Sequence, residues 1–132
     1  MNNKDIEKKI HEEFYWFHKH PELSYAEVNT TKRIKKNLQE AAIDVLDLPL
    51  QTGLVAQIGS GKPPIAAIRC DIDALPIQEE TDLAYKSQTE GKMHACGHDF
   101  HISTILGAAY ILKQKEKDLK GKKVLVTAGP TI

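Results

Sequence analysis

The spacing of apolar residues changes several times along the chain, and the order of these changes constrains the fold most strongly. Three segments carry apolar side chains at helical spacing: residues 4–19, 25–42 and 100–115. Three short apolar runs bounded by turn residues predict strands: residues 54–58, 65–68 and 122–128. Helices and strands in this order are typical of an α/β layered structure. With 132 residues, the chain is long enough for one domain with a single core.

Apolar and proline positions also predict how these elements are buried and where they end. The run 65–68 has no polar alternation, so we expect a strand that is covered on both faces. The first helix should end just before Pro21, because a residue that precedes proline avoids the α region. In the second helix, Val28, Ile34 and Leu38 form an apolar stripe that is expected to face the core.

The charge balance and the cysteines narrow the functional class. The 18 basic and 18 acidic side chains cancel, which argues against a nucleic acid or an anionic membrane as a partner. No stretch approaches the roughly 18 apolar residues of a membrane span, so we expect a cytoplasmic protein. Cys70 and Cys96 do not resemble a disulfide framework; in a reducing compartment they remain thiols or bind metal.

Two carboxylates follow the second predicted strand, within the segment 69–76. Asp71 and Asp73 point the same way if the strand continues, because side chains repeat every second residue. Two like charges this close repel each other unless a cation or a shared proton lies between them. The alternative is a solvated turn between a strand and a loop, ended by Pro76.

Five candidate metal ligands lie within eight residues, just before the third predicted helix: His94, Cys96, His98, Asp99 and His101. Thiolate, neutral imidazole and carboxylate are the ligands that a borderline metal ion prefers. A single glycine separates Cys96 from His98 and lets the backbone bend so that both reach one ion. The cluster therefore predicts a metal site.

Isolated residues of the same types usually have structural roles. We expect Cys70 to be an inert buried thiol, and His11, His18 and His20 to be structural or exposed. A catalytic zinc site takes about three protein ligands and a water molecule, so two neighbouring ligands do not complete one. Further ligands must come from elsewhere in the chain or from residues that it lacks.

Three segments together resemble one family: residues 17–23 (Phe-His-Lys-His-Pro-Glu-Leu), 69–77 (Arg-Cys-Asp-Ile-Asp-Ala-Leu-Pro-Ile) and 93–101 (Met-His-Ala-Cys-Gly-His-Asp-Phe-His). They look like signatures of the aminoacylase/carboxypeptidase metallopeptidases, in the branch of N-acyl-amino-acid amidohydrolases, hippurate hydrolases and N-acetyldiaminopimelate deacetylases. The resemblance runs from about residue 10 to about residue 121. It implies a zinc-exopeptidase-like three-layer α/β sandwich, incomplete here, with helices packing on a mixed, mostly parallel sheet.

The resemblance also implies a site and its chemistry. Two divalent ions (Zn, Mn, Co or Ni) would lie at the carboxyl end of the sheet, with Cys96 and His98 as metal ligands. Asp71, or alternatively Asp73, would orient a ligand or assist catalysis, and Asp99 and His101 would fix the geometry of the ligands. The substrate would be an N-acyl amino acid or a small peptide-like molecule, and the complete enzyme would form homodimers through a lid domain.

The chain departs from the family pattern near its end. The family's Gln-Pro-Ala-Glu-Glu motif, which carries the general base, is missing, and so are the later histidine ligands. Residues 122–132 instead resemble the opening strand and nucleotide-contacting turn of phosphopantothenate–cysteine ligases, or a generic strand followed by a Gly-Pro turn. We therefore interpret residues 1–132 as the N-terminal portion of a metallohydrolase catalytic domain, and expect little or no hydrolysis by this chain alone.

Two other functions use the same residues. A thiol hydrolase would employ Cys96 as nucleophile and His98 or His101 as base, and it would survive chelation but not alkylation. A third possibility is a non-catalytic metal-binding or interaction fragment; well under one tightly held ion per chain would indicate a degraded remnant.

Overall fold

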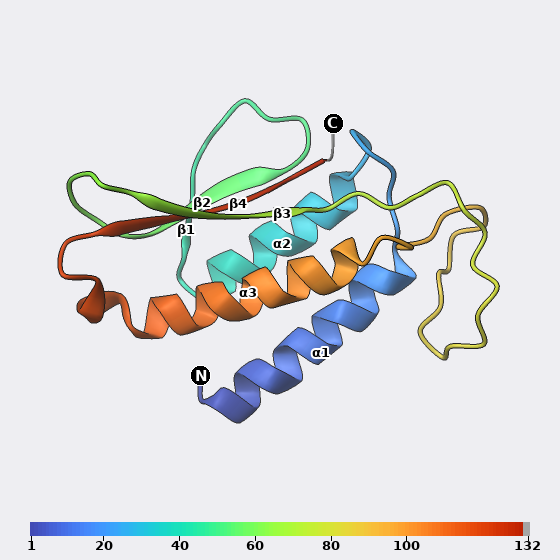
Figure 1. The fold of residues 1–132 in the computed structure, drawn as a ribbon, viewed down its shortest axis with the longest axis horizontal. Helices are drawn as coiled ribbons and strands as arrows, with labels where there is room; N and C mark the ends of the chain where they lie inside the picture. Colours follow the sequence, from blue (N-terminus) through green and yellow to red (C-terminus); the bar gives the residue numbers. More distant parts are fainter. Residues whose placement is uncertain (131–132) are drawn as a thin grey trace.

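A four-stranded mixed sheet carries three helices on one of its faces in the computed structural model, which describes residues 1–130 (Figure 1). The elements in chain order are α1 (Asn3–Lys19), α2 (Val28–Glu40), β1 (Asp44–Val45), β2 (Leu54–Gly59), β3 (Ala66–Asp71), α3 (His98–Gln114), the 3₁₀ turn η1 (Glu116–Leu119) and β4 (Lys123–Gly129). The three predicted helices and three predicted strands are all present. The two-residue β1 and the four-residue η1 were not predicted, because segments this short carry no periodicity.

The strands lie in the order β1-β2-β4-β3, so the last strand of the chain is inserted between two earlier ones. β1 and β2 are antiparallel, as are β2 and β4, whereas β3 and β4 are parallel. Helices packed on a mixed sheet confirm the predicted α/β class. Within residues 1–130, the parallel character of the sheet rests on the β3–β4 pair.

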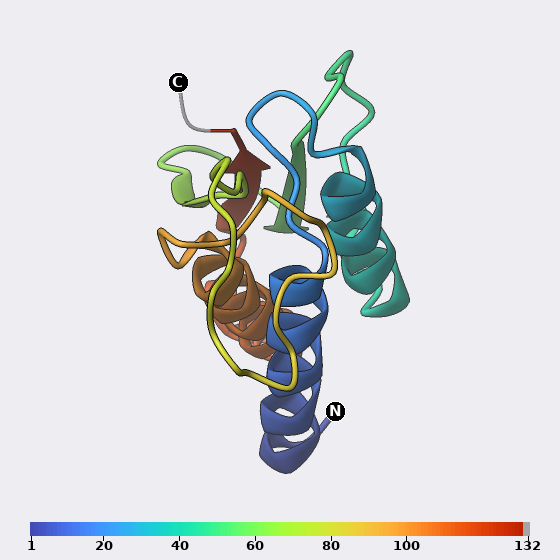
Figure 2. The ribbon, with the colours of Figure 1, turned by 90° about the vertical axis from the view of Figure 1, so that its right-hand side faces the viewer.

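The core lies between the sheet and the helices. β2 and β4 bury every second side chain on the helical face: Leu54, Ala56, Ile58, Val124, Val126 and Ala128. α3 meets them with Ile102, Leu106 and Ala109, and α1 packs on α3 from the side away from the sheet (Figure 2). The described residues thus form a sheet and one helical layer of the expected sandwich.

The expected burial of the 65–68 run on both faces is wrong. Ala66, Ala67 and Arg69 of β3 are exposed, and Ile68 is half-buried. The reason is position: β3 ends the strand order, has β4 as its one neighbour among residues 1–130, and has helices on one side alone. An apolar run shows that a strand tolerates burial, and its neighbours decide whether burial occurs.

The helix boundaries follow local chemistry. α1 begins with a capping box between Asn2 and Asp5 and ends before Pro21, as predicted. α2 starts at Val28, three residues later than predicted, and Val28 is 46% exposed rather than part of the buried stripe. Ile34 and Leu38 are buried as expected. No helix in residues 1–130 combines the length and the apolar character needed to cross a membrane.

Candidate metal site

The candidate site lies where β3 ends, at Asp71, and where α3 begins, at His98. The carboxyl ends of strands are where α/β proteins usually place functional groups. The long connection 72–97 returns close to its own start, because Leu75 and Met93 exchange two backbone hydrogen bonds of 2.9 and 3.0 Å. This bridge brings the aspartate segment and the histidine–cysteine segment together.

The ring of His98 is held in one orientation. Its Nδ1 lies 2.8 Å from the backbone oxygen of Asp73. A carbonyl oxygen only accepts, so Nδ1 carries a proton, and in the neutral tautomer Nε2 keeps its lone pair. Nε2 faces Asp71, with 3.9 Å between Nε2 and Oδ2. A histidine that binds a metal is usually fixed in this way, by donating its other ring N–H to a carbonyl or carboxylate.

Both predicted aspartates converge on this imidazole, from opposite edges of the ring. The Oδ1 atom of the buried Asp73 lies 3.2 Å from Nδ1 of His98. The half-buried Asp71 lies on the Nε2 side and accepts a short hydrogen bond from Arg69. The guanidinium of Arg69 and the imidazole dipole of His98 reduce the repulsion between the two carboxylates.

Cys96 and His101 are both exposed and border the same site. Gly97 adopts a left-handed φ of +78°, which turns the chain sharply between Cys96 and His98. The ring of His101 lies 5.7 Å from that of His98, centre to centre. Within residues 1–130 the Cys96 thiol makes no hydrogen bond to either imidazole, although a cysteine nucleophile is normally paired with its base.

Asp99 points away from the candidate ligands. This buried carboxylate lies 2.6 Å from Nδ1 of His18, in the last turn of α1. The other ring nitrogen of His18 lies 2.9 Å from the buried Glu79. His18 is therefore structural, as expected, but with two charged partners that the sequence did not indicate. One signal was available: His18 follows Phe14 by one helical turn, which puts an imidazole on an apolar stripe.

Two further buried groups, Glu27 and His94, make no hydrogen bond through their side chains in the described part of the chain. Burial lowers the pKa of His94 to about 4, although the charges of Asp99 and Asp73 act in the opposite direction. Burial also raises the pKa of Glu27, and the nearby negative charge of Asp73 adds to this effect. The sequence did not single out Glu27.

The donor types at the site suit a divalent ion of the zinc class, because Cys96 offers sulfur and His98 offers an oriented ring nitrogen. Their number is lower than a catalytic site requires. Among residues 1–130, no three His, Cys, Asp or Glu side chains come together in a group that could hold a metal ion. The described residues therefore supply donor types that suit a metal ion, but not a complete set of ligands.

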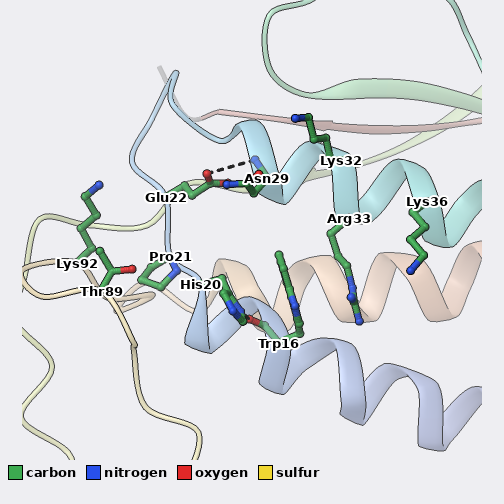
Figure 3. Close-up of a pocket in the computed structure, with 10 residues that line it drawn as sticks. All are labelled: Trp16, His20, Pro21, Glu22, Asn29, Lys32, Arg33, Lys36, Thr89 and Lys92. Carbon is green, nitrogen blue, oxygen red and sulfur yellow. Dashed lines mark hydrogen bonds between the residues drawn. The ribbon is translucent and has the colours of Figure 1, made fainter.

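Two pockets differ in their relation to this site. A pocket of about 390 Å³ adjoins it and is lined by Arg69, Cys70, Asp71, Phe100, His101, Thr104 and Ile105. A pocket of about 480 Å³ lies beside α2 and contains none of the candidate residues (Figure 3). There Arg33 lies over the ring of Trp16, and Glu22 accepts hydrogen bonds from the first turn of α2, so these two charged side chains have structural roles.

Comparisons with known proteins agree on one family. The model of peptidase family M20/M25/M40 matches residues 67–130. N-acetylcysteine deacetylase of Bacillus subtilis is 55% identical over 106 residues, which are 79% of this chain and 28% of that protein. An IAA-amino acid hydrolase of Arabidopsis thaliana is 44% identical over 109 residues, 83% of this chain and 25% of that protein.

A solved structure of a dinuclear metal binding peptidase of the M20 family from Bacillus subtilis superposes with a TM-score of 0.93 at 46% sequence identity. The superposition covers 98% of this chain and 36% of that structure. This chain thus spans between about a quarter and a little over a third of the length of these relatives.

Proposed function

The chain belongs to peptidase family M20/M25/M40. On this premise we propose that the chain forms one part of a metal-dependent amidohydrolase, and that this part contributes Cys96 and His98 as metal ligands. One observation carries the proposal. Nδ1 of His98 donates its proton to the Asp73 carbonyl, so Nε2, which faces Asp71, is the ring nitrogen that can bind a metal.

The two aspartates have different roles in this proposal. Asp73 is a positioning residue, because its backbone oxygen and carboxylate both lie at Nδ1 of His98. Asp71 lies on the reacting side, where Arg69 holds its carboxylate in place. His101 borders the pocket next to Asp71 and can contact a bound substrate there. A bound divalent ion would polarise the amide carbonyl and lower the pKa of a water molecule.

The relatives suggest the ions and the substrates. One solved relative is described as dinuclear, which favours two divalent ions, of Zn, Mn, Co or Ni. The names of the curated relatives point to N-acyl amino acids as the substrate class. Since a catalytic zinc site needs about three protein ligands and Cys96 and His98 supply two, we propose that residues 1–132 alone hydrolyse such substrates little or not at all.

A chimera tests this function. The 106 residues of this chain that align with N-acetylcysteine deacetylase would replace their counterparts in that enzyme. We expect the chimera to hydrolyse N-acetylcysteine, to lose activity on chelation and regain it with Zn²⁺ or Mn²⁺, and to lose most activity on Cys96→Ser. Cys70→Ala is the matched control and should keep the activity. Hydrolysis that resists chelation but is stopped by alkylation would instead establish Cys96 as a nucleophile.

A further inference from the structure

His18 lies between two buried carboxylates. Its Nδ1 is 2.6 Å from Oδ2 of Asp99, and its Nε2 is 2.9 Å from Oε1 of Glu79. The three residues are 6%, 2% and 5% exposed, respectively. The rings of Tyr85 and Phe14 pack against the imidazole, with centres 5.3 and 6.1 Å away. The ring is therefore held on its faces as well as at both nitrogens.

The geometry fixes the protonation state of this group. Ionised carboxylates only accept hydrogen bonds, and a neutral imidazole donates from one nitrogen alone. With Asp99 and Glu79 ionised, both nitrogens of His18 must carry protons, and the ring is an imidazolium. It neutralises part of the buried charge of Asp99 and Glu79, which a neutral ring would leave uncompensated.

Glu79 links this imidazolium to the long connection between β3 and α3. The carboxylate also accepts hydrogen bonds from the backbone N–H of Ser87, at 2.8 Å, and from the hydroxyl of Thr81. One residue further on, the N–H of Gln88 donates to the backbone oxygen of Lys19, at 2.9 Å. The connection is thus anchored at two points to the end of α1, shortly before it enters the segment with the candidate ligands.

Asp99 links the same imidazolium to the first turn of α3. It directly follows His98, and its Oδ1 accepts the backbone N–H of Phe100 at 2.8 Å. A negative charge in this turn also interacts favourably with the helix dipole. A displacement of Asp99 would move the backbone of its neighbour His98, and with it the turn that carries Cys96.

We propose that His18 is a positioning residue for the metal site: it clamps Glu79 and Asp99 together and so fixes the turn that presents Cys96 and His98. The inference depends on the proposed function for the roles of those two ligands. The first turn of α3 and the connection before it meet at this imidazole, so its loss would loosen both sides of the ligand turn.

A second buried ionic cluster supplies the control. Glu13 of α1 is paired with Arg33 of α2 by two hydrogen bonds of 2.8 and 2.9 Å, and it also accepts one from Asn37 at 2.7 Å. This cluster joins α1 to α2, and among the described residues it makes no hydrogen bond or ion pair with Cys96 or His98. Arg33→Gln should therefore reduce stability without changing the metal site.

The experiment compares Co²⁺ binding by the whole chain in three forms. Co²⁺ gives visible bands whose energy and intensity report the ligands and their geometry. His18→Gln should weaken Co²⁺ binding by about 10- to 100-fold and should alter the bands. Loss of a residue that orients metal ligands commonly has an effect of this size. Arg33→Gln should keep the affinity and the spectrum of the unmodified chain. Equal affinity and spectra for His18→Gln and the unmodified chain would overturn the proposal.

A measurement without metal separates this inference from the proposed function. In the unmodified chain the amides of Phe100 and Ser87 should be protected from hydrogen exchange by Asp99 and Glu79. His18→Gln, or the milder Glu79→Gln, should speed exchange at Phe100 about tenfold and leave the β2–β4 amides unchanged. If the unmodified chain binds no Co²⁺, the proposed function fails, while unchanged exchange at Phe100 and Ser87 in both variants refutes the positioning role by itself.

Discussion

Two histidines, His18 and His94, are almost equally buried, at 6% and 4% exposure, yet the chain treats them in opposite ways. His18 has a carboxylate at each ring nitrogen, whereas neither nitrogen of His94 has a hydrogen-bond partner in the described residues. Burial lowers the pKa of His18, but its hydrogen bonds to Asp99 and Glu79 outweigh burial and raise the pKa above 6.5. Burial alone dominates at His94, where the pKa falls to about 4.

Hydrogen-bond partners, more than depth of burial, therefore decide whether a buried imidazole is charged. A buried imidazole can stay charged where opposite charges and hydrogen bonds replace the water. Where they do not, it loses its proton and is neutral. The carboxylates around His18 accordingly favour the imidazolium form, which joins two segments, whereas His94 is a neutral ring at neutral pH in the segment of the candidate ligands.

The largest expected effect follows from removing the charged ring. His18→Leu leaves Glu79 and Asp99 buried without the cation between them, so we expect the free energy of unfolding to fall by about 3–5 kcal/mol. Urea denaturation followed by circular dichroism measures it. His11→Leu, on the exposed side of the same helix, is the control and should change stability little. A loss below 1 kcal/mol for His18→Leu would contradict the imidazolium assignment.

The next effect is a pH dependence contributed by His94. Between its unfolded pKa of 6.5 and its folded pKa of about 4, the unfolded chain binds a proton at this residue and the folded chain does not. Stability should therefore fall as the pH falls through this window, by roughly 3 kcal/mol for this residue. His94→Leu should remove that contribution, seen as the difference between two curves of unfolding free energy against pH.

In the same curves of unfolding free energy against pH, His18 should contribute a slope of opposite sign to that of His94. Its folded pKa lies above its unfolded value of 6.5, so the folded chain holds more protons at this residue above pH 6.5. The stabilisation is complete below pH 6.5 and is lost as the pH rises through the folded pKa. His18→Leu should flatten this alkaline decline, and His94→Leu should leave it intact. Equal effects of both variants on the alkaline side would show that the two rings do not differ as described.

The smallest effect is expected at Glu27, a fully buried carboxyl with no hydrogen-bond partner for its side chain among the described residues. Its pKa is raised, so the folded chain pays for any ionisation as the pH increases. Glu27→Gln keeps the shape and removes the ionisable group. We expect no loss of stability at neutral pH and a gain of up to about 1 kcal/mol, measured by denaturation. A marked loss would mean that the carboxylate itself stabilises the fold.

The sequence predicted what depends on local pattern. Apolar periodicity located all three helices, and short apolar runs bounded by turn residues located β2, β3 and β4. It failed where neighbours decide burial: β3 is exposed because it ends the strand order, and Val28 is exposed at the first turn of α2.

In the candidate site, too, some residues could be found from the sequence, whereas other contacts depend on tertiary packing. Strand period and motif spacing singled out the aspartates and His98 as two separate segments, and the family resemblance joined them in one site. The structure places Asp73 within hydrogen-bonding range of His98 and Asp71 3.9 Å from its Nε2. The partners of His18 lie 61 and 81 residues away in sequence, so the pairing depends on tertiary packing that no local pattern records. The ligand roles of Cys96 and His98 remain predictions.

The most direct test of the central claim, that Cys96 and His98 bind a divalent metal, is the ultraviolet absorption of this chain titrated with Cd²⁺, because a cadmium–thiolate bond produces a charge-transfer band. We predict a saturable band that disappears in Cys96→Ser, weakens strongly in His98→Ala and persists in Cys70→Ala. A band that survives Cys96→Ser, or its complete absence from the unmodified, fully reduced chain, would contradict the claim.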